Sequence, residues 1–116
     1  MKFGKNVHLS QNVSIECHKS ISFGSNTTVG FDTMFMDSDH HFIIDLREGI
    51  ETTKNNTLPI LIGEHNWICA RCIIMKGLET SKNCIISAGT VIGNKKINEN
   101  VLVGNGFIKE NKNWRV

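Results

Sequence analysis

The sequence predicts an all-β fold, a parallel β-helix, on three observations. An aliphatic or small residue returns at every sixth position between residues 62 and 92, namely at Ile62, Ile68, Ile74, Thr80, Ile86 and Ile92. A second, mostly apolar or small set follows four positions later, at Asn66, Cys72, Leu78, Cys84, Thr90 and Lys96. The residues directly after the first set are mostly small. Helices repeat at about 3.6 residues and strands at about 2, so a period of six indicates a short extended segment plus a corner, three of which close a triangular coil.

Stacking of such coils explains the choice of residues. Coils lie about 4.8 Å apart, the spacing of paired strands, so equivalent positions sit on top of one another. β-Branched side chains then form ladders inside a prism that has no room for rings. We expect glycine where the chain turns in little space or with positive φ, at Gly63, Gly77, Gly89 and Gly93.

Three stretches carry a resemblance to a known family. They read ILIGEHNWI at residues 60–68, IIMKG at 73–77 and IISAGTVI at 85–92. Together they resemble the hexapeptide-repeat acyltransferases, and in motif they are most similar to the sugar and polysaccharide O-acetyltransferases, such as those acting on galactosides or maltose. The resemblance covers residues 3–104 and implies a left-handed β-helix, a handedness that periodicity alone does not give.

Length and charge restrict the classes of function. The chain has 116 residues, which corresponds to one domain, and a net charge of +2 with both signs interspersed. So weak a field argues against nucleic acid or an anionic membrane as partner. No apolar run approaches the roughly 20 residues of a membrane span, and the start lacks a signal-peptide apolar region, so we expect a cytoplasmic protein.

The first third of the chain, residues 1–36, is expected to form two coils. Phe3, Leu9, Ile15 and Ile21 repeat at six, after which the register moves by two. The shifted register continues through Cys17, Phe23, Val29 and Phe35. The phenylalanines indicate wider or terminal positions in the prism.

Residues 37–59 interrupt the repeat and are expected to hold the active-site segment and an extended loop. Polar residues cluster in the DSDHH run at 37–41, and residues 45–58 follow neither period. Pro59 marks the return to the helix. The family resemblance implies that this loop, at about 45–59, reaches toward a neighbouring subunit and frames the active site.

Residues 60–104 are expected to form the remaining coils, and residues 105–116 a cap. After Ile92 the register slips through a turn at 93–96, and a last part-coil follows. The tail is short, charged and ends near Trp114. We expect it to cover the open end of the prism, since an uncovered coil edge invites strand addition.

The cysteines are expected to be free thiols, and no metal is expected. One Cys-x-x-Cys pair, Cys69 and Cys72, is a weak zinc signal without a second pair or spaced histidines. The hexad register explains both residues more simply, since Cys69 takes a small position and Cys72 and Cys84 take inward ones.

The segment DSDHHFI at residues 37–43 resembles the Asp-Ser-Asp-x-His segment of the family, whose last histidine is the general base. This assigns the base to His41, a residue type suited to take a hydroxyl proton near neutral pH. Asp39 and Asp37 are expected to orient the imidazole or the acceptor. His40 takes the variable position and, in an extended segment, points to the opposite side. His8, His18 and His65 are expected to be solvated or packed.

Trp67 lies between two inward positions and is therefore expected to point outward, where it needs a partner. In the family the tryptophan of this motif lines the acyl-CoA tunnel at a trimer interface; plain subunit packing is the alternative. By motif position, Ala70 and Ala88 match residues that contact the pantetheine arm.

The resemblance also suggests which cations would meet the phosphates of the donor. Lys95 or Lys96 matches a basic turn residue near these phosphates. The end of the repeat departs from the family, because GNGFIK at residues 104–109 lacks the usual proline and the spacing of the basic residue. Lys109 is the substitute that the sequence offers.

The sequence therefore predicts a homotrimeric acetyl-CoA-dependent O-acetyltransferase that acts on a sugar hydroxyl of a surface polysaccharide, capsule or lipopolysaccharide, or of its precursor. Two alternatives from other classes stay open. One is a hydratase resembling the γ-carbonic anhydrases, with zinc held by histidines such as His40, His41 and His65. The other is a catalytically silent β-helix scaffold.

Overall fold

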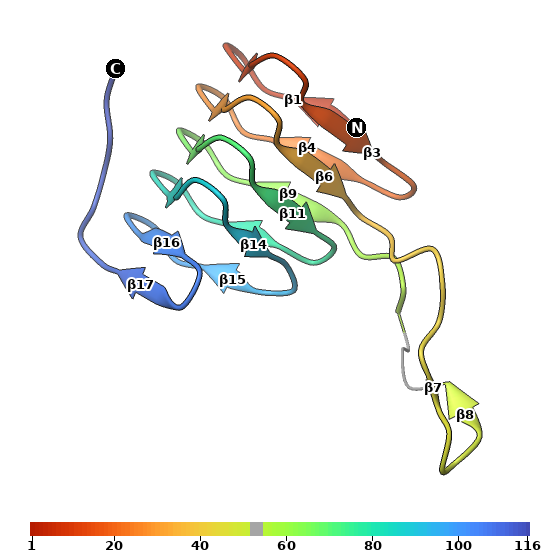
Figure 1. Ribbon diagram of the computed structural model, residues 1–116. Coiled ribbons are helices and arrows are strands. Elements are labelled where there is room, and N and C mark those ends of the chain that lie inside the picture. Colours follow the sequence, from red (N-terminus) through yellow and green to blue (C-terminus); the bar gives the residue numbers. More distant parts are fainter. Residues whose placement is uncertain (52–54) are drawn as a thin grey trace.

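The computed structural model describes residues 1–51 and 55–116, and in it the chain winds into a stack of triangular coils (Figure 1). Three sheets form the sides of the prism. Sheet A contains β1 (Lys2–Phe3), β4 (Ile21–Phe23), β9 (Ile60–Ile62), β12 (Glu79–Thr80) and β15 (Lys96–Ile97). Sheet B contains β2 (His8–Leu9), β5 (Thr28–Val29), β10 (Trp67–Ile68), β13 (Ile85–Ile86), β16 (Leu102–Gly104) and β17 (Phe107–Lys109). Sheet C contains β3 (Ser14–Glu16), β6 (Met34–Met36), β11 (Ile73–Met75) and β14 (Val91–Ile92). Apart from the β16–β17 pair, pairing within the three sheets is parallel.

Strand register gives the length of each coil. Trp67 pairs with Ile85, 18 positions further on, as three hexads require. His8 pairs with Thr28, 20 positions on, which matches the register shift expected near residue 17. Each turn of chain therefore adds one strand to each sheet. None of the described residues lies in a helix, so the described chain has no helix able to cross a membrane.

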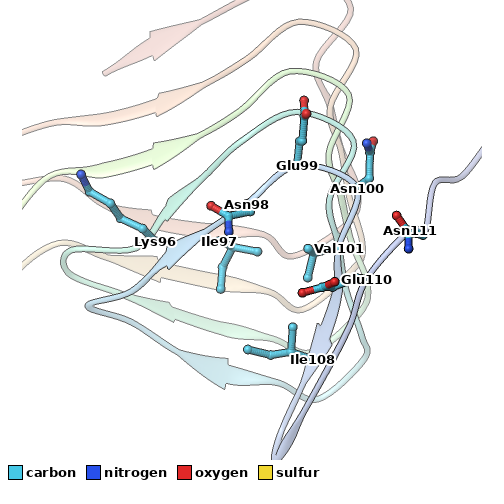
Figure 2. Close-up of a pocket in the computed structure, with 9 residues that line it drawn as sticks. All are labelled: Lys96, Ile97, Asn98, Glu99, Asn100, Val101, Ile108, Glu110 and Asn111. Atoms are coloured by element: carbon cyan, nitrogen blue, oxygen red, sulfur yellow. The ribbon is translucent and has the colours of Figure 1, made fainter.

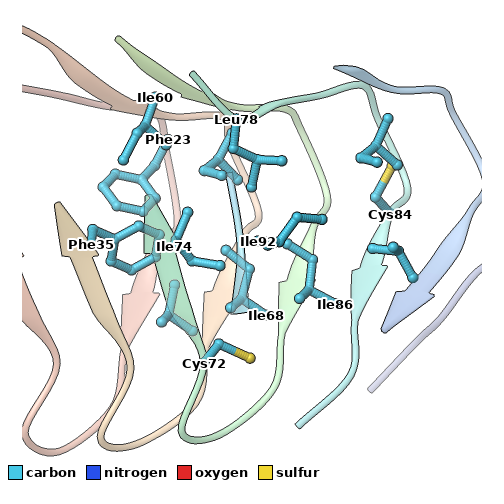
Figure 3. Packing of buried hydrophobic residues seen from close by; sticks show 14 of the residues in the cluster. Phe23, Phe35, Ile60, Ile68, Cys72, Ile74, Leu78, Cys84, Ile86 and Ile92 are labelled. Carbon is cyan, nitrogen blue, oxygen red and sulfur yellow. The ribbon is translucent and has the colours of Figure 1, made fainter. Parts of the chain in front are cut away.

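The predicted hexads form the interior. The six residues of the first set are all buried: Ile62, Ile68, Ile74, Thr80, Ile86 and Ile92. Five members of the second set are buried as well, and several line the packed column in Figure 3. Lys96 is the exception, because Ile85 pairs with Leu102 after only 17 positions and the register has slipped. Lys96 begins β15 and is exposed, so it is neither inward nor within a turn.

The phenylalanines lie toward the first-coil end of the prism. Phe3 is half exposed and stacks on Phe23, with ring centroids 5.2 Å apart. Phe23 meets Phe35 edge to face inside the prism, at 4.9 Å. Both inner rings are buried, in the coil next to the wider, 20-residue repeat. The terminal position of Phe3, on the first strand of sheet A, agrees with the prediction, whereas the expectation that the interior has no room for rings was wrong, because the prism buries Phe23 and Phe35.

The corners need residues that tolerate left-handed or crowded backbone. Gly77 and Gly89 have φ of 79° and 74°. A Cβ on Gly63 would lie 2.5 Å from the carbonyl oxygen of Ser81 on the next coil, so only glycine fits there. Elsewhere the left-handed corner residue is mostly asparagine, the side chain that best tolerates this region: Asn6, Asn12, Asn26, Asn83, Asn94 and Asn100.

Polar groups inside the prism pair with each other or with the backbone. Asn66 donates to the carbonyl oxygens of Glu64 and Ser81, and it accepts from the Thr80 hydroxyl at 2.6 Å. Across the described residues, no buried side-chain nitrogen or oxygen lacks a hydrogen-bond partner. The interior is thus fully satisfied, and it leaves no internal group for chemistry.

Residues 37–59, which we name the excursion segment, leave the helix after β6 and return at β9. In Figure 1 this segment projects away from the coils, toward the lower right. The predicted extended loop is confirmed where it is described, but it carries a short antiparallel hairpin of β7 (Ile44–Asp45) and β8 (Ile50–Glu51) that the sequence pattern did not indicate. Residues 52–54 of the predicted loop lie outside the described residues.

The tail only partly matches the predicted cap. β17 pairs antiparallel with β16 and covers the last edge of sheet B, after a two-residue turn at Asn105 and Gly106. The chain then runs back along the outside of the prism, where Lys112 donates its backbone N–H to the Asn100 carbonyl. A hollow of about 470 Å³ remains between the last coil and the tail (Figure 2). The prediction that the whole tail covers the open end was wrong, because Trp114 packs on a side of the prism.

The alternation of inward and outward positions predicts a large difference between two neighbouring substitutions. Ile62→Ala removes a buried side chain and is expected to lower the free energy of unfolding by about 2–5 kcal/mol. Leu61→Ala, on the outer face of the same strand, is expected to cost less than about 1 kcal/mol. Urea unfolding followed by circular dichroism measures both, and equal losses would contradict the inward assignment.

Candidate active site

The excursion segment begins at a buried carboxylate. Asp37 follows β6 directly and is fully buried. Its oxygens accept hydrogen bonds from the backbone N–H groups of His18, Lys19 and Ser20, at 2.8, 2.7 and 2.9 Å. These donors lie at the corner where the first coil carries its extra residues. Asp37 therefore holds two consecutive coils together at the point where the chain departs.

The same contacts determine the protonation of Asp37. Burial raises the pKa of its carboxyl group, but the three backbone N–H donors and the nearby His18 side chain together lower it by more, so the net pKa lies below the ordinary value. Both oxygens are engaged by backbone. The geometry of Asp37 is that of a structural anchor beneath the segment that carries His41.

Lys76 contacts both limbs of the excursion segment, one through an ion pair and the other through a hydrogen bond. Lys76 Nζ lies 2.6 Å from Asp39 Oδ2 and donates a hydrogen bond of 2.8 Å to the carbonyl oxygen of Asn55. Lys76 is mostly buried and belongs to the corner after β11. Asp39 stands on the outgoing limb and Asn55 on the returning limb, whose backbones also pair through Asp39 N–H and Asn56 O at 2.7 Å. The predicted orienting carboxylate thus acts on the loop through a lysine that the sequence reasoning missed.

His40 and His41 stand at a bend. His40 has φ of 65°, so this stretch is bent, and the prediction of an extended segment with alternating side chains was wrong. His40 Nε2 lies 3.2 Å from Glu16 Oε2. His41 is exposed, and among the described contacts none engages its imidazole ring.

Trp67 points outward from sheet B, as predicted, and is 40% exposed. It lies against the tail of its own chain, with its ring centroid 6.0 Å from that of Trp114. Trp114 in turn stacks on His65 at 4.2 Å and donates its indole N–H to the His65 carbonyl at 2.8 Å. His65 is thus packed, as expected, and the outward tryptophan has one partner within the chain.

Ala70 and Ala88 lie together at the corner between sheets B and C. They belong to consecutive coils, joined by the Gly89 N–H to Ala70 O hydrogen bond of 3.0 Å. A Cβ on Gly89 would meet no heavy atom within 4 Å, so the surface beside the alanines is open. A small, open corner of this kind leaves the backbone accessible to an extended ligand.

The predicted phosphate-binding lysines lie elsewhere. Lys95 and Lys96 follow the corner between sheets C and A, and Lys96 Nζ is 3.8 Å from Glu79 Oε2. Lys109 lies on β17 with its ammonium group 5.7 Å from the Phe107 ring centre. Within one chain, Lys95, Lys96 and Lys109 therefore do not lie together beside Ala70 and Ala88.

The predicted site residues fall into two groups. His41, Asp39 and Lys95 belong to the C–A corner and the excursion segment that leaves it, whereas Trp67, Ala70 and Ala88 belong to sheet B and the B–C corner. A single prism presents these groups on different sides.

The four cysteines are unpaired. Burial, and then the neighbouring Cys72, raise the pKa of the Cys69 thiol to about 11. Cys72 and Cys84 are fully buried, and their thiols donate to the carbonyl oxygens of Ser87 and Asn98. The expectation of buried or packed free thiols is confirmed.

Comparison with known proteins gives the fold. No family model matches the chain, and no curated protein matches it in sequence. Among solved structures, the chain resembles the polySia-specific acetyltransferase NeuO with a TM-score of 0.84 and 19% identity, over 98% of this chain and 49% of that one. It resembles a hexapeptide-repeat acetyltransferase from Vibrio cholerae O1 biovar eltor, complexed with acetyl coenzyme A, with a TM-score of 0.75, 20% identity, and coverage of 98% and 60%.

A third likeness is to a maltose O-acetyltransferase from Clostridium difficile 630, with a TM-score of 0.58, 22% identity, and coverage of 99% of this chain and 67% of that one. The chain spans about half to two thirds of the length of these proteins. All three structures are named as acetyltransferases, and one of them as a hexapeptide-repeat acetyltransferase, the family that the sequence motifs resemble. The likeness confirms the predicted fold, a left-handed parallel β-helix.

The contacts of Asp37 predict an acid-dependent loss of stability. Asp37→Asn leaves backbone donors unsatisfied and is expected to cost about 1–3 kcal/mol at pH 7. Because the folded pKa lies below the unfolded value of about 3.9, the stabilisation is complete above that pH and disappears as the pH falls through the folded pKa.

Chemical unfolding of wild type and Asp37→Asn between pH 7 and pH 2.5 measures this effect. The two curves should converge at the acid end. Asp32→Asn, which removes an exposed carboxylate paired with Arg71 at 3.6 Å, is the matched control and should change stability by less than about 1 kcal/mol. A constant difference at all pH values would contradict the carboxylate's role.

The raised pKa of Cys69 predicts a slow thiol. At pH 8, iodoacetamide should modify Cys69 in the folded chain at least about tenfold more slowly than free cysteine, because few thiolates form. Peptide mass spectrometry gives the rate at each site. All four cysteines should react rapidly in urea, and fast native labelling of Cys69 would show that burial does not protect it.

Proposed function

We propose that the chain is the β-helix portion of an acetyl-CoA-dependent O-acetyltransferase that acts on a sugar hydroxyl of a surface polysaccharide or its precursor. The observation that carries the proposal is His41: an exposed imidazole without a polar partner among the described contacts, on a segment whose base is anchored by Asp37 and Lys76. The fold supports it, since the similar solved structures are acetyltransferases, three of them named for polysialic acid or maltose. Because these proteins are longer and less than 25% identical, the activity is a proposal for this chain.

The residues of the chain account for the proton in such a reaction. The acceptor hydroxyl oxygen attacks the thioester carbonyl, a ring nitrogen of His41 takes the hydroxyl proton, and the thiolate of coenzyme A leaves and recovers a proton from the imidazolium. Acetyl-CoA supplies the acetyl group as a thioester. Lys76 and Asp39 hold both limbs of the loop, so they act as positioning residues for His41. Since the donor is a cytoplasmic metabolite, we place the reaction in the cytoplasm.

The donor is proposed to lie along the B–C corner. Ala70 and Ala88 have small side chains there, and the space beside Gly89 is open, which suits a flexible pantetheine arm held by backbone groups. Trp67 lies on the adjoining strand and offers an exposed apolar ring. Lys95, Lys96 and Lys109 are proposed to meet the phosphates from a neighbouring copy or from the tail.

The separation of the two groups of residues supports a homotrimer. Sheet C exposes a column of apolar side chains in strand register, Met34, Ile73 and Val91. Phe42, Ile44 and Leu46 on the excursion segment are exposed as well. Closed threefold symmetry would cover both surfaces and bring His41 of one copy to Trp67 of the next. Analytical ultracentrifugation of Ile73→Glu against wild type measures this association.

The test of the catalytic base is acetyl transfer to a panel of sugar acceptors, followed by thiol release from acetyl-CoA. His41→Ala should lower turnover by about 10²–10⁴-fold, the usual contribution of a positioned base. His8→Ala, an exposed histidine on β2, is the matched control and should keep wild-type turnover. Sedimentation should show the same assembly for all three proteins.

Two results would overturn the proposal. Equal turnover in His41→Ala and wild type would remove His41 as the base. Absence of thiol release by wild type with every acceptor, with the assembly intact, would favour the scaffold.

A further inference from the structure

Two histidines and a carboxylate meet on the surface beside the excursion segment, outside the proposed catalytic residues. Glu16 is the last residue of β3, His18 follows it at the corner of the first coil, and His40 stands 22 residues further along the chain. One candidate ligand atom from each lies within 4.8 Å of the others. His40 Nε2 and Glu16 Oε2 are 3.2 Å apart, and the two imidazole rings meet edge to face at 4.6 Å.

The backbone of each of these residues is fixed by a separate contact. Glu16 pairs in register with Met36 of the next coil. The N–H of His18 donates to the buried Asp37 carboxylate at 2.8 Å. The N–H of His40 donates to Ser38 Oγ at 3.1 Å, and that hydroxyl also accepts from Thr57 Oγ1 at 2.9 Å. Only side-chain torsions are left to adjust, so the three groups start from a preorganised arrangement.

The donor set is that of a transition-metal site, and one pair of its ligand atoms has the spacing of such a site. Two imidazoles and one carboxylate are a common protein ligand set for Zn²⁺, which leaves a fourth position to water. With metal–ligand distances of about 2.0–2.1 Å, two ligand atoms of a tetrahedral site stand roughly 3.3 Å apart. The His40–Glu16 separation of 3.2 Å already has this value. His18 is exposed, and its candidate ligand atom lies within 4.8 Å of the other two.

We propose that Glu16, His18 and His40 bind one divalent metal ion of the zinc type. The ion ties the first coil to the residue directly before His41, and so it orders the bend that presents the proposed base. This role is positional and does not require the ion to take part in acetyl transfer. The binding itself does not rest on the proposed function, whereas its consequence for His41 does.

The binding test uses the tag-free full chain, stripped with a chelator and titrated with Zn²⁺ in a calorimeter. We expect one ion per chain, bound at least about tenfold more weakly in His18→Ala, His40→Ala or Glu16→Gln than in wild type. His8→Ala, which alters an exposed histidine on β2, should bind as wild type does. Circular dichroism confirms that each variant is folded.

Cobalt identifies the ligands. Co²⁺ bound by nitrogen and oxygen shows visible d–d bands without the intense near-ultraviolet charge transfer of thiolate ligands. The d–d bands should appear in wild type and be lost in His18→Ala. A thiolate band that persists in the variants would assign the metal to cysteines and overturn the site.

Hydrogen exchange tests the positional consequence. Zn²⁺ should slow amide exchange at residues 38–43 by at least about tenfold in wild type and leave it unchanged in His18→Ala. If Zn²⁺ does not bind at one ion per chain, or binds equally well to wild type and all variants, the proposed metal site is wrong and the cluster is only an ion pair between His40 and Glu16. If Zn²⁺ binds but amide exchange at residues 38–43 does not slow, the proposed ordering of the bend before His41 is wrong. The acetyltransferase assay tests the proposed function separately.

Discussion

The structure depends on coils stacked at strand spacing, each pairing with the coil about 18 residues before it. Because the backbone of one coil bonds to the next, equivalent side chains lie on top of one another and inward positions must form ladders. The interior is filled mainly with Ile, Val, Phe, Leu, Cys and Thr and has no unsatisfied polar group among the described residues. All chemistry is therefore displaced to corners, outer faces and the one segment that leaves the stack.

The excursion segment is tolerated because its two limbs are tied back to the stack. Asp37 anchors the outgoing limb on three backbone donors, and Lys76 bridges both limbs through Asp39 and Asn55. The entropy cost of ordering a long connection is thus offset at its base. The bend that carries His40 and His41 consequently starts from backbone held by several contacts, which is what the proposed role of His41 as a general base requires.

The prism places the predicted site residues of one chain on different sides, although the sequence motifs assign them to one site. A triangular coil has three sides, so residues six or twelve positions apart face different directions even when the sequence places them in one motif. His41 belongs to the C–A corner, and Trp67 and Ala70 belong to sheet B and its far corner. The exposed apolar column on sheet C offers a surface through which copies can unite the two groups. We therefore propose that acetyl transfer requires the assembled trimer.

The sequence by itself determined the coiled fold, the residues that fill its interior and the place where residues 37–59 leave it. This is because each coil must repeat the same six-residue pattern to stack on the one before it. It also predicted the inward cysteines and the outward tryptophan. Only tertiary structure decided the left-handed asparagine corners, the Asn105–Gly106 hairpin, the packing of Trp114 on His65, the Lys76 bridge and the Glu16–His18–His40 cluster. These features join residues on different coils or beyond the repeat, and periodicity carries no information about side chains that meet across the corners of neighbouring coils.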